Sequence, residues 1–597
     1  MGSCAPFVLL LGILACLARS RSGVVYGQSL ARRSADIPGP DNFFRHRYPT
    51  VVALGDYVYI DGGELSHLPN GTETNTTQSG LPLSSYAENS TLSLSLKESW
   101  TNDTVEFRSI SKRAPPLDQQ VYWSDPSNGA GALYTWGGMA VGSASPPADD
   151  DLWRFNADGT GGGTWTISSE GDYRDFVRLV RPVGAAFTQG NQVGYALGGQ
   201  ATSKTDSSIQ KEYPGYALPG LVSYDFQTGN WTNSTTTPNS YGALGTSLNG
   251  LAEFVPFGPN GLLLFLGGAE APIDATNETI VQTAINGVYL YDPSTGKWYK
   301  QPITGDRPSP FERACSVGVP GPNNTYEIYI YGGTSTQGTG KTSADVHVLS
   351  LPGFVFFDAH SPGTPRADHA CAAVGKGKRQ MLSYGGINGE PGLPGGNTET
   401  TADPWKQGLG VYDMSEMTWK DSFDPDAADY ESPAVVTDWY ANGGMDKVTW
   451  CDEGLKGLFI NDSAIAYGAA GNETDSSSDD THKKVGIIVG STVGGTIALA
   501  IIGAVLFWVL RKRSRERSQS RLAETIDEYR PEPWPKDSPR LRSVTPGTMV
   551  SAPTPTLIEI HGTTRGELPA EDVEWTYELP APTPKLRSEL PDRKYST

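Results

Sequence analysis

The chain has 597 residues, more than one ordinary domain requires, and its formal net charge at pH 7 is −20. The segment after residue 510 holds 15 basic and 14 acidic residues, which leaves 31 basic and 52 acidic residues before it, a net charge of −21. So acidic a region argues against nucleic acid or an anionic membrane surface as its partner, and is typical of a well-solvated surface.

The N-terminus carries a short apolar run at residues 7–17, followed by small residues. This pattern predicts a secretory signal peptide over residues 1–27, with Ala18 and Gly27 as alternative cleavage points. No Lys or Arg precedes the run, which departs from the usual pattern. An N-terminal membrane anchor is the alternative, but the run is short for one.

A double glycine closes a short apolar run six times between residues 57 and 386, at intervals of 53 to 75 residues. Paired glycines permit positive φ and a close backbone approach, so each run is predicted to be a strand ending at its glycines. Self-similarity at this period indicates an array of small units that bury their apolar faces together. The glycines are Gly62, Gly63, Gly137, Gly138, Gly198, Gly199, Gly267, Gly268, Gly332, Gly333, Gly385 and Gly386.

A second signal follows most glycine pairs: an aromatic residue, often with Asp after it, and a Trp seven residues later. The clear cases are Tyr224 with Trp231, Tyr291 with Trp298, and Tyr412 with Trp419. Phe155 and Trp165 repeat the pattern with an insertion, while Leu349 with Phe356 and Ser93 with Trp100 keep the step in degraded form. Turn residues between the two positions predict that one strand ends near the Tyr and the next begins near the Trp.

Glycine pairs, Tyr-Asp and Trp at these offsets resemble the kelch repeat, whose unit is a four-stranded blade of a β-propeller. The resemblance covers residues 44–422 and implies an all-β fold with six blades, distantly like the galactose oxidase propeller. The twelve glycines would then be structural, together with Trp100, Trp165, Trp231, Trp298 and Trp419. Residues 181–183, 312–315 and 368–371 resemble the innermost strand of such a blade. A seventh blade from residues 438–460 is an alternative, although that segment lacks the Tyr and Trp signals.

Three cysteines lie outside the signal segment: Cys315, Cys371 and Cys451. Cys315 and Cys371 occupy equivalent places in successive units. A disulfide between them is chemically permitted outside the cell, but equivalent positions on neighbouring strands can exceed the bridging distance. We therefore expect two small buried core residues, with the disulfide as the alternative.

Residues 65–99 form a Ser-, Thr- and Asn-rich segment within the first unit, predicted to be a glycosylated surface loop. Residues 202–220 and 389–404 are similar insertions that are candidates for ligand contacts. Ten N-x-S/T sequons precede residue 485, and no Asn follows residue 510, as expected when only the first part is exposed to the glycosylation machinery. The sequons begin at Asn70, Asn75, Asn89, Asn102, Asn230, Asn233, Asn277, Asn323, Asn461 and Asn472.

Residues 423–484 are predicted to hold a short helix within 430–444 and then a polar, acidic stalk. Residues 485–510 carry no charge over 26 positions, enough for a transmembrane helix. The basic run from Arg511 to Arg517 then places the C-terminus in the cytoplasm, which predicts a type I plasma-membrane protein. Gly486, Gly490 and Gly494 form a small-residue face that suits close packing in a homodimer.

Residues 511–597 contain 12 prolines and no sustained periodicity, which predicts a disordered cytoplasmic tail. The tripeptide Glu-Leu-Pro recurs three times at a constant step of 11 residues, beginning at residues 567, 578 and 589. This regularity favours a repeated docking motif for intracellular partners.

The resemblance to galactose oxidase raises a membrane-anchored copper enzyme as an alternative function. That family binds copper with two His, two Tyr and a Cys linked to one Tyr, whereas the ectodomain histidines, His46, His67, His347, His360 and His369, form no ligand pair at close spacing. The most polar cluster, residues 366–369, is expected either to line the channel or to be structural. We therefore predict no catalytic, metal-binding or cofactor-binding residue.

The leading hypothesis is accordingly a cell-surface binding protein. Its propeller loops would bind an extracellular protein or glycan, and its tail would bind intracellular partners. The layout resembles that of single-pass kelch-repeat membrane proteins of filamentous fungi. A cell-polarity scaffold, as intracellular kelch proteins suggest, is a further alternative.

Overall fold

A computed structural model describes residues 37–68, 84–142, 144–147, 151–168, 176, 179–238, 240–335, 342–388 and 402–460. Among these residues no helix is both long enough and apolar enough to span a membrane. Several predictions lie outside the described residues: the signal peptide, the stalk, the transmembrane segment with Gly486, Gly490 and Gly494, the tail, and the sequons at Asn70, Asn75, Asn461 and Asn472.

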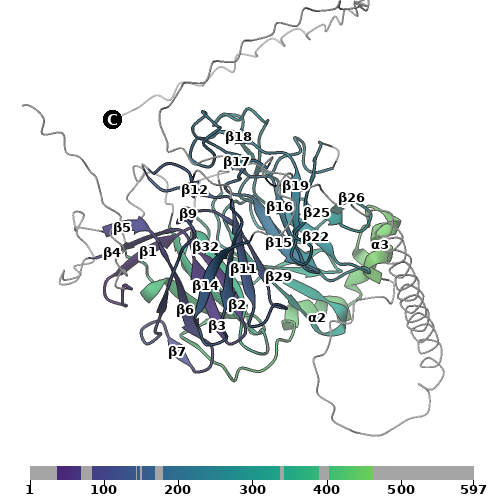
Figure 1. Ribbon diagram of the computed structural model, residues 1–597. Coiled ribbons are helices and arrows are strands. Elements are labelled where there is room, and N and C mark those ends of the chain that lie inside the picture. Colours follow the sequence, from purple (N-terminus) through teal and green to yellow (C-terminus); the bar gives the residue numbers. More distant parts are fainter. Residues whose placement is uncertain are drawn as a thin grey trace, which may run out of the picture. The chain divides into compact units, whose positions relative to one another are not determined.

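The described chain is mostly β-structure, arranged in successive antiparallel sheets (Figure 1). Sheet 1 holds β2 (Thr50–Leu54), β3 (Tyr57–Asp61), β6 (Ser90–Ser95) and β8 (Arg108–Ser111). Sheet 2 holds β10 (Val121–Asp125), β11 (Ala132–Trp136), β13 (Trp153–Ala157) and β14 (Gly163–Ile167). Sheet 3 holds β15 (Ala186–Gly190), β16 (Val193–Leu197), β19 (Leu221–Asp225) and β20 (Trp231–Ser234).

Three further large sheets follow in chain order. Sheet 4 holds β21 (Leu251–Val255), β22 (Leu262–Leu266), β25 (Gly287–Asp292) and β26 (Lys297–Pro302). Sheet 5 holds β28 (Cys315–Pro320), β29 (Tyr326–Tyr331), β30 (Val346–Leu351) and β31 (Val355–Asp358), with β27 (Thr304–Gly305) added in parallel at its outer edge. Sheet 6 holds β32 (Ala367–Val374), β33 (Gln380–Ile387), β34 (Leu409–Asp413) and β35 (Thr418–Lys420).

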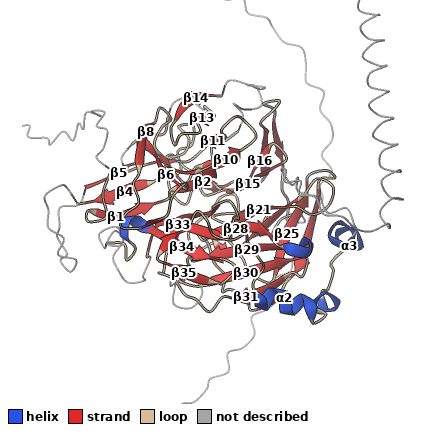
Figure 2. Cartoon of the chain, turned by 90° about the horizontal axis from the view of Figure 1, so that it is seen from below, coloured by secondary structure: helices blue, strands red, loops and turns tan. Residues whose placement is uncertain are grey.

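Apart from the added strand β27, each large sheet begins with its innermost strand and proceeds outward along the chain. The innermost strands β2, β32, β28, β21, β15 and β10 pack against one another in this order. Figure 2 shows the remaining strands running outward from that centre, for example from β28 through β29 and β30 to β31. This arrangement is that of a β-propeller, and its mostly β character agrees with the fold class that the repeat predicts.

The glycine pairs lie where the second strand of a sheet meets the next sheet. Gly198 has φ +69°, and a Cβ atom there would lie 2.3 Å from the carbonyl oxygen of Ser247 in the following sheet. The N–H of Gly199 donates to that same oxygen at 2.7 Å. The second glycine donates in the same way in four other pairs, namely Gly63 to Leu117, Gly138 to Pro182, Gly268 to Phe311 and Gly333 to Arg366. The motif therefore joins neighbouring sheets through the backbone.

Beyond the glycines the chain continues into small sheets. These are β12 (Met139–Ala140) with β9 (Leu117–Asp118), β17 (Gln200–Ala201) with β18 (Tyr216–Ala217), and β23 (Ala269–Glu270) with β24 (Val281–Gln282). In the first unit the equivalent sheet is β1 (Phe43–Arg47), β4 (Glu64–His67) and β5 (Ser84–Ala87), labelled together in Figure 1. The 65–99 loop prediction is therefore wrong at both ends, because buried residues such as Leu65, Leu92 and Leu94 pair as strands there.

The seven-residue step between aromatic residues is a cross-strand pair. Tyr224 lies opposite Trp231, Tyr291 opposite Trp298, Tyr412 opposite Trp419, and Leu349 opposite Phe356. Phe155 and Trp165 also face each other across their hairpin. Ser93 and Trp100 do not. Ser93 pairs with Arg108, whereas Trp100 lies in β7 (Trp100–Thr101), opposite Phe423 of β36 (Ser422–Phe423), because the chain turns away after β6 to meet the end of sheet 6.

The segment after sheet 6 is helical. It contains α2 (Ala434–Ala441), the 3-10 helix η4 (Gly444–Lys447) and α3 (Glu453–Ile460), while the short η1 (Pro322–Asn324) and η3 (Lys406–Gly408) lie within sheet connections. Phe459 of α3 packs on Phe257 and Phe354, with ring centroids 4.4 and 5.0 Å apart. The short helix predicted within 430–444 is α2. The seventh blade from residues 438–460 is wrong, because these residues bury Leu455 and Phe459 through helices against existing sheets.

Closure of the propeller, where sheet 6 meets sheet 1, involves the N-terminal strand β1. β1 precedes sheet 1 in sequence but packs against β33 of sheet 6. Arg45 of β1 and Arg366 of sheet 6 both contact the carboxylate of Asp403, at 3.3 and 3.0 Å, and all three side chains are almost completely buried. The first and last sheets are thus tied by a buried ionic network as well as by β7 and β36.

Candidate functional site

Six residues with left-handed backbone conformation lie just before or at the start of the innermost strands. They are Tyr48, Gln119, Gly184, Asn249, Arg313 and Asp368, with φ between +50° and +66°. Backbone N–H groups link them from sheet to sheet: Tyr48 donates to Asp368, Asp368 to Arg313, Arg313 to Asn249, Asn249 to Gly184, and Gly184 to Gln119, at 2.8 to 3.5 Å. Five junctions of the propeller therefore carry the same bond. Asn tolerates this conformation well and Gly adopts it freely, but the other residues do so at a cost that the ring offsets.

All six residues of this left-handed ring line a cavity of about 430 Å³. All six innermost strands contribute to the cavity wall. Its polar lining consists mainly of amides and hydroxyls, including Gln119, Gln120, Tyr122, Ser124, Thr188, Gln189, Asn249 and Ser316. Polar groups from all six sheets converge on this axial cavity, which makes it the default candidate for ligand binding.

The charges at the ring largely neutralise one another. The carboxylate of Asp368, only 2% exposed, lies 3.4 Å from Arg47 Nε and 3.5 Å from Arg313 Nη1. This carboxylate is the main reason that the pKa of Arg313 is raised above its ordinary value. The guanidinium of Arg47 also lies over the Tyr48 ring, 4.3 Å from its centroid. The polar groups at the left-handed ring are therefore held in fixed orientations relative to one another.

The carboxyl group of Glu253 also lines the cavity, and among the described residues it forms no salt bridge. Glu253 accepts a hydrogen bond from Ser316 Oγ at 2.7 Å, and burial raises the pKa of Glu253 to about 7. Its charge in the folded protein is consequently sensitive to pH near neutrality.

This raised pKa predicts that Glu253→Gln changes the pH dependence of stability. Below about pH 4.5 the carboxyl is protonated in both states, so variant and wild type should unfold alike; as pH rises through about 7 the wild type loses up to about 3 kcal/mol that the variant keeps. Denaturant titrations at pH 4.5 and 8 measure the difference. The exposed Glu98→Gln is the control, and equal pH slopes for Glu253→Gln and wild type would contradict the prediction.

The polar cluster at residues 366–369 divides between two roles. Asp368 and His369 line the cavity. Arg366 lies outside it, fully buried, with its guanidinium bonded to the Gly385 carbonyl and to Asp403 and stacked over Trp405 at 4.0 Å. Asp368 and His369 thus match the prediction that the cluster lines the channel, and Arg366 matches the prediction that it is structural.

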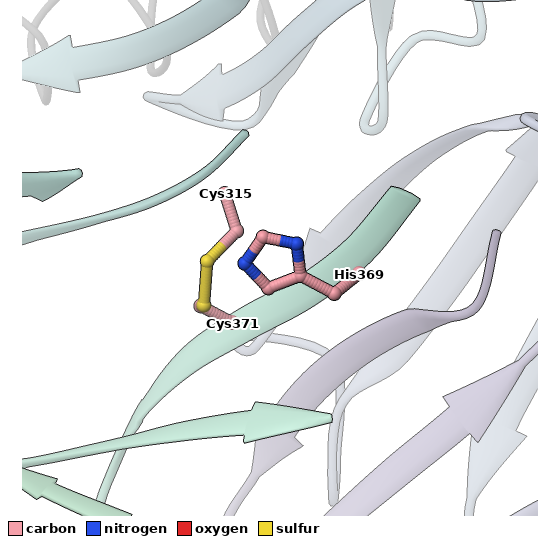
Figure 3. A group of neighbouring side chains, drawn as sticks. All are labelled: Cys315, His369 and Cys371. Atoms are coloured by element: carbon pink, nitrogen blue, oxygen red, sulfur yellow. A yellow bond between two sulfur atoms is a disulfide. The ribbon is translucent and has the colours of Figure 1, made fainter. Parts of the chain in front are cut away.

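The expectation of two unpaired thiols is wrong. Cys315 and Cys371 form a disulfide with their Cα atoms 5.6 Å apart, within the usual bridging range. The innermost strands β28 and β32 approach closely enough because they meet at the propeller axis. Cys451 is free and exposed. Figure 3 shows His369 beside the disulfide bond.

Of the other histidines, His46 is buried and His347 is half-buried. Burial lowers the pKa of His46 to about 4, and its ring nitrogens lie 3.0 Å from Tyr384 Oη and 2.8 Å from the Gly62 carbonyl. His347 has a lowered pKa for the same reason. His46 and His347 belong to different sheets and, among the described residues, join no group of three potential metal ligands.

The lowered pKa of His46 predicts acid-sensitive folding. The unfolded chain binds this proton near pH 6.5 and the folded chain only near pH 4, so stability is complete above pH 6.5 and falls by up to about 3 kcal/mol on acidification to pH 4. His46→Gln should flatten the dependence of the unfolding free energy between these values. His360→Gln, at an 81% exposed side chain, should leave it unchanged, and a profile of His46→Gln matching wild type would be inconsistent with this assignment.

The described sequons differ in accessibility. Asn89, Asn230, Asn233, Asn277 and Asn323 are exposed. Asn102 is half-buried, and its side-chain amide donates to the Leu409 carbonyl at 3.3 Å. Asn102 is consequently the poorest glycan acceptor among them.

Of the structural tryptophans, Trp100, Trp165 and Trp231 are buried, and Trp298 and Trp419 are half-buried.

Comparison with known proteins supports a kelch-type propeller. The chain is 23% identical over 457 residues to a kelch repeat-containing protein of Arthroderma benhamiae, an alignment that covers 70% of this chain and 62% of that protein. The chain thus spans less than two thirds of the relative's length. A solved structure described as YjhT superposes with a TM-score of 0.41 and 14% identity, covering 64% of this chain and 99% of that one. No family model matches.

Proposed function

We propose that this protein is a non-catalytic cell-surface binding protein whose six-bladed propeller holds its ligand in the axial cavity. The observation that carries the proposal is the convergence of all six innermost strands on one cavity, whose polar lining is mainly amides and hydroxyls beside the charged Glu253, Arg313, Asp368 and Lys378. Of the two ligand classes that the sequence suggests, the cavity favours a glycan. Its volume of about 430 Å³ suits a sugar unit at a chain end, and its uncharged donors and acceptors match hydroxyl groups.

The proposed topology rests on sequence pattern. The apolar N-terminus, the uncharged segment at 485–510 and the basic residues after it suit a type I protein with its propeller outside the plasma membrane. The exposed sequons support this placement. The Pro-rich tail would then bind intracellular partners, and the Gly486, Gly490 and Gly494 face would allow a homodimer.

A glycan array probed with the purified full-length protein tests the ligand. Gln189 lies in the cavity wall on β15, and Gln189→Ala should weaken binding of the selected glycan about tenfold through loss of hydrogen bonding. The exposed turn variant Gln227→Ala is the matched control. Failure to bind any glycan, or equal affinity of wild type and Gln189→Ala, would refute the cavity assignment.

Endoglycosidase digestion of the protein from intact cells tests the topology. We expect a shift to faster electrophoretic mobility, because at least the five exposed sequons would carry glycans. Unchanged mobility would argue for an intracellular propeller and for the scaffold alternative.

A further inference from the structure

Three side chains that can bind a metal, two Cys and one His, meet at the junction of sheets 5 and 6. Cys315 begins β28, while His369 and Cys371 lie two residues apart in β32. The two sulfur atoms and a nitrogen of the imidazole all lie within 4.8 Å of one another. Figure 3 shows the His369 ring beside the sulfur–sulfur bond.

The buried imidazole of His369 provides a second, independent observation that points to a ligand. Its side chain belongs to a residue only 7% exposed, yet neither ring nitrogen makes a hydrogen bond of acceptable geometry with the described residues. The Tyr331 ring meets it edge to face, with ring centroids 5.0 Å apart. Buried imidazole nitrogens are ordinarily paired, so these two are available to a ligand.

The site is also accessible. Cys315, His369 and Cys371 all line the axial cavity, together with the ring of left-handed residues. An ion can therefore reach the three donors from the cavity, and the cavity leaves room for a water molecule or other fourth ligand.

We propose that reduction of the Cys315–Cys371 disulfide creates a site for one thiophilic d¹⁰ cation, with Cys315, Cys371 and His369 as its protein ligands. A thiol reductant supplies two electrons and two protons, so that the sulfur–sulfur bond becomes two thiols and the reductant becomes a disulfide. Binding of the cation then displaces the two thiol protons as two metal–sulfur bonds form.

The donor set selects this class of ion. Two thiolates and one neutral imidazole suit Zn²⁺ or Cu⁺, which prefer sulfur and nitrogen, and not Ca²⁺ or Mg²⁺. Zn²⁺ binds sulfur at about 2.3 Å and nitrogen at about 2.0–2.1 Å, distances that donors already within 4.8 Å of one another reach with small side-chain movements. Sheets 5 and 6 hold the two strands in place independently of the disulfide through the Asp368-to-Arg313 and Gly333-to-Arg366 backbone bonds.

The test uses the purified full-length protein, with Zn²⁺ as the probe. Protein reduced with a small thiol, freed of it by gel filtration and dialysed against Zn²⁺, should bind one more zinc per chain than the oxidised protein. His369→Gln should weaken this binding at least about tenfold, and Cys371→Ser should abolish it. Cys451→Ser, at the free exposed thiol, is the matched control and should bind as wild type does.

Co²⁺ in place of Zn²⁺ provides a spectroscopic readout of the ligands. Reduced wild type should show thiolate-to-cobalt charge-transfer absorption that Cys371→Ser lacks, with circular dichroism recording that the sheets persist. The proposal is overturned if reduction adds no zinc, if His369→Gln binds as tightly as wild type, or if reduction abolishes the β-sheet signal and so disperses the donors.

Discussion

Replacement of Asp403 by alanine is expected to lower the free energy of unfolding by about 3–5 kcal/mol, among the largest effects of any single substitution in this chain. The Asp403 side chain is 0% exposed and faces two buried cations, Arg45 at 3.3 Å and Arg366 at 3.0 Å. Its carboxylate also accepts a hydrogen bond from the backbone N–H of Trp405 at 2.9 Å. Alanine would leave two guanidinium groups buried without their counter-ion, at the contact between the N-terminal strand and the last sheet.

Equilibrium unfolding in denaturant, followed by tryptophan fluorescence, measures this effect. Asp403→Asn should lie between the variant and wild type, because an amide oxygen still accepts hydrogen bonds but carries no charge. Asp421→Ala removes an exposed carboxylate nearby in sequence and should change stability by less than about 0.5 kcal/mol. Asp403→Ala with the stability of Asp421→Ala would show that the network does not hold the ring closed.

The substitution Gly198→Ala is expected to destabilise the protein by about 2–4 kcal/mol. Its Cβ would lie 2.3 Å from the Ser247 oxygen, which also accepts the Gly199 N–H. Gly198 directly follows β16, and Ser247 lies between the bridged residues Thr246 and Leu248, so neither backbone can move away cheaply. The left-handed φ of +69° adds strain for any residue with a side chain.

Gly129→Ala separates the two causes in that experiment. Gly129 has φ +63°, but a Cβ there would meet no atom within 4 Å. It should therefore show only the conformational cost, about 1 kcal/mol. Equal thermal midpoints for the two alanine variants would mean that contact between the sheets contributes nothing to the glycine requirement.

Part of the candidate site was predictable from individual residues. Of the three segments expected to be innermost strands, only residues 368–371 lie wholly within one, β32. Residues 312–314 precede β28, which begins at Cys315, and residues 181–183 precede β15. The left-handed ring was not recognisable, because Tyr48, Gln119, Asn249, Arg313 and Asp368 share a backbone conformation and no side-chain type. Glu253 had no signal either, since its raised pKa comes from burial by strands distant in sequence.

By itself, the sequence determined the local features: where strands end, which aromatic residues pair across hairpins, and how often the unit repeats. These follow from backbone freedom at glycine and from the short spacing across a turn. Only the tertiary structure decided which units meet. It brings the Cα atoms of Cys315 and Cys371 to 5.6 Å from each other and sets β1 against sheet 6. It also makes residues 453–460 a helix that covers an existing core. Closure of the ring sets these distances, and ring closure depends on all the sheets at once, which no local pattern encodes.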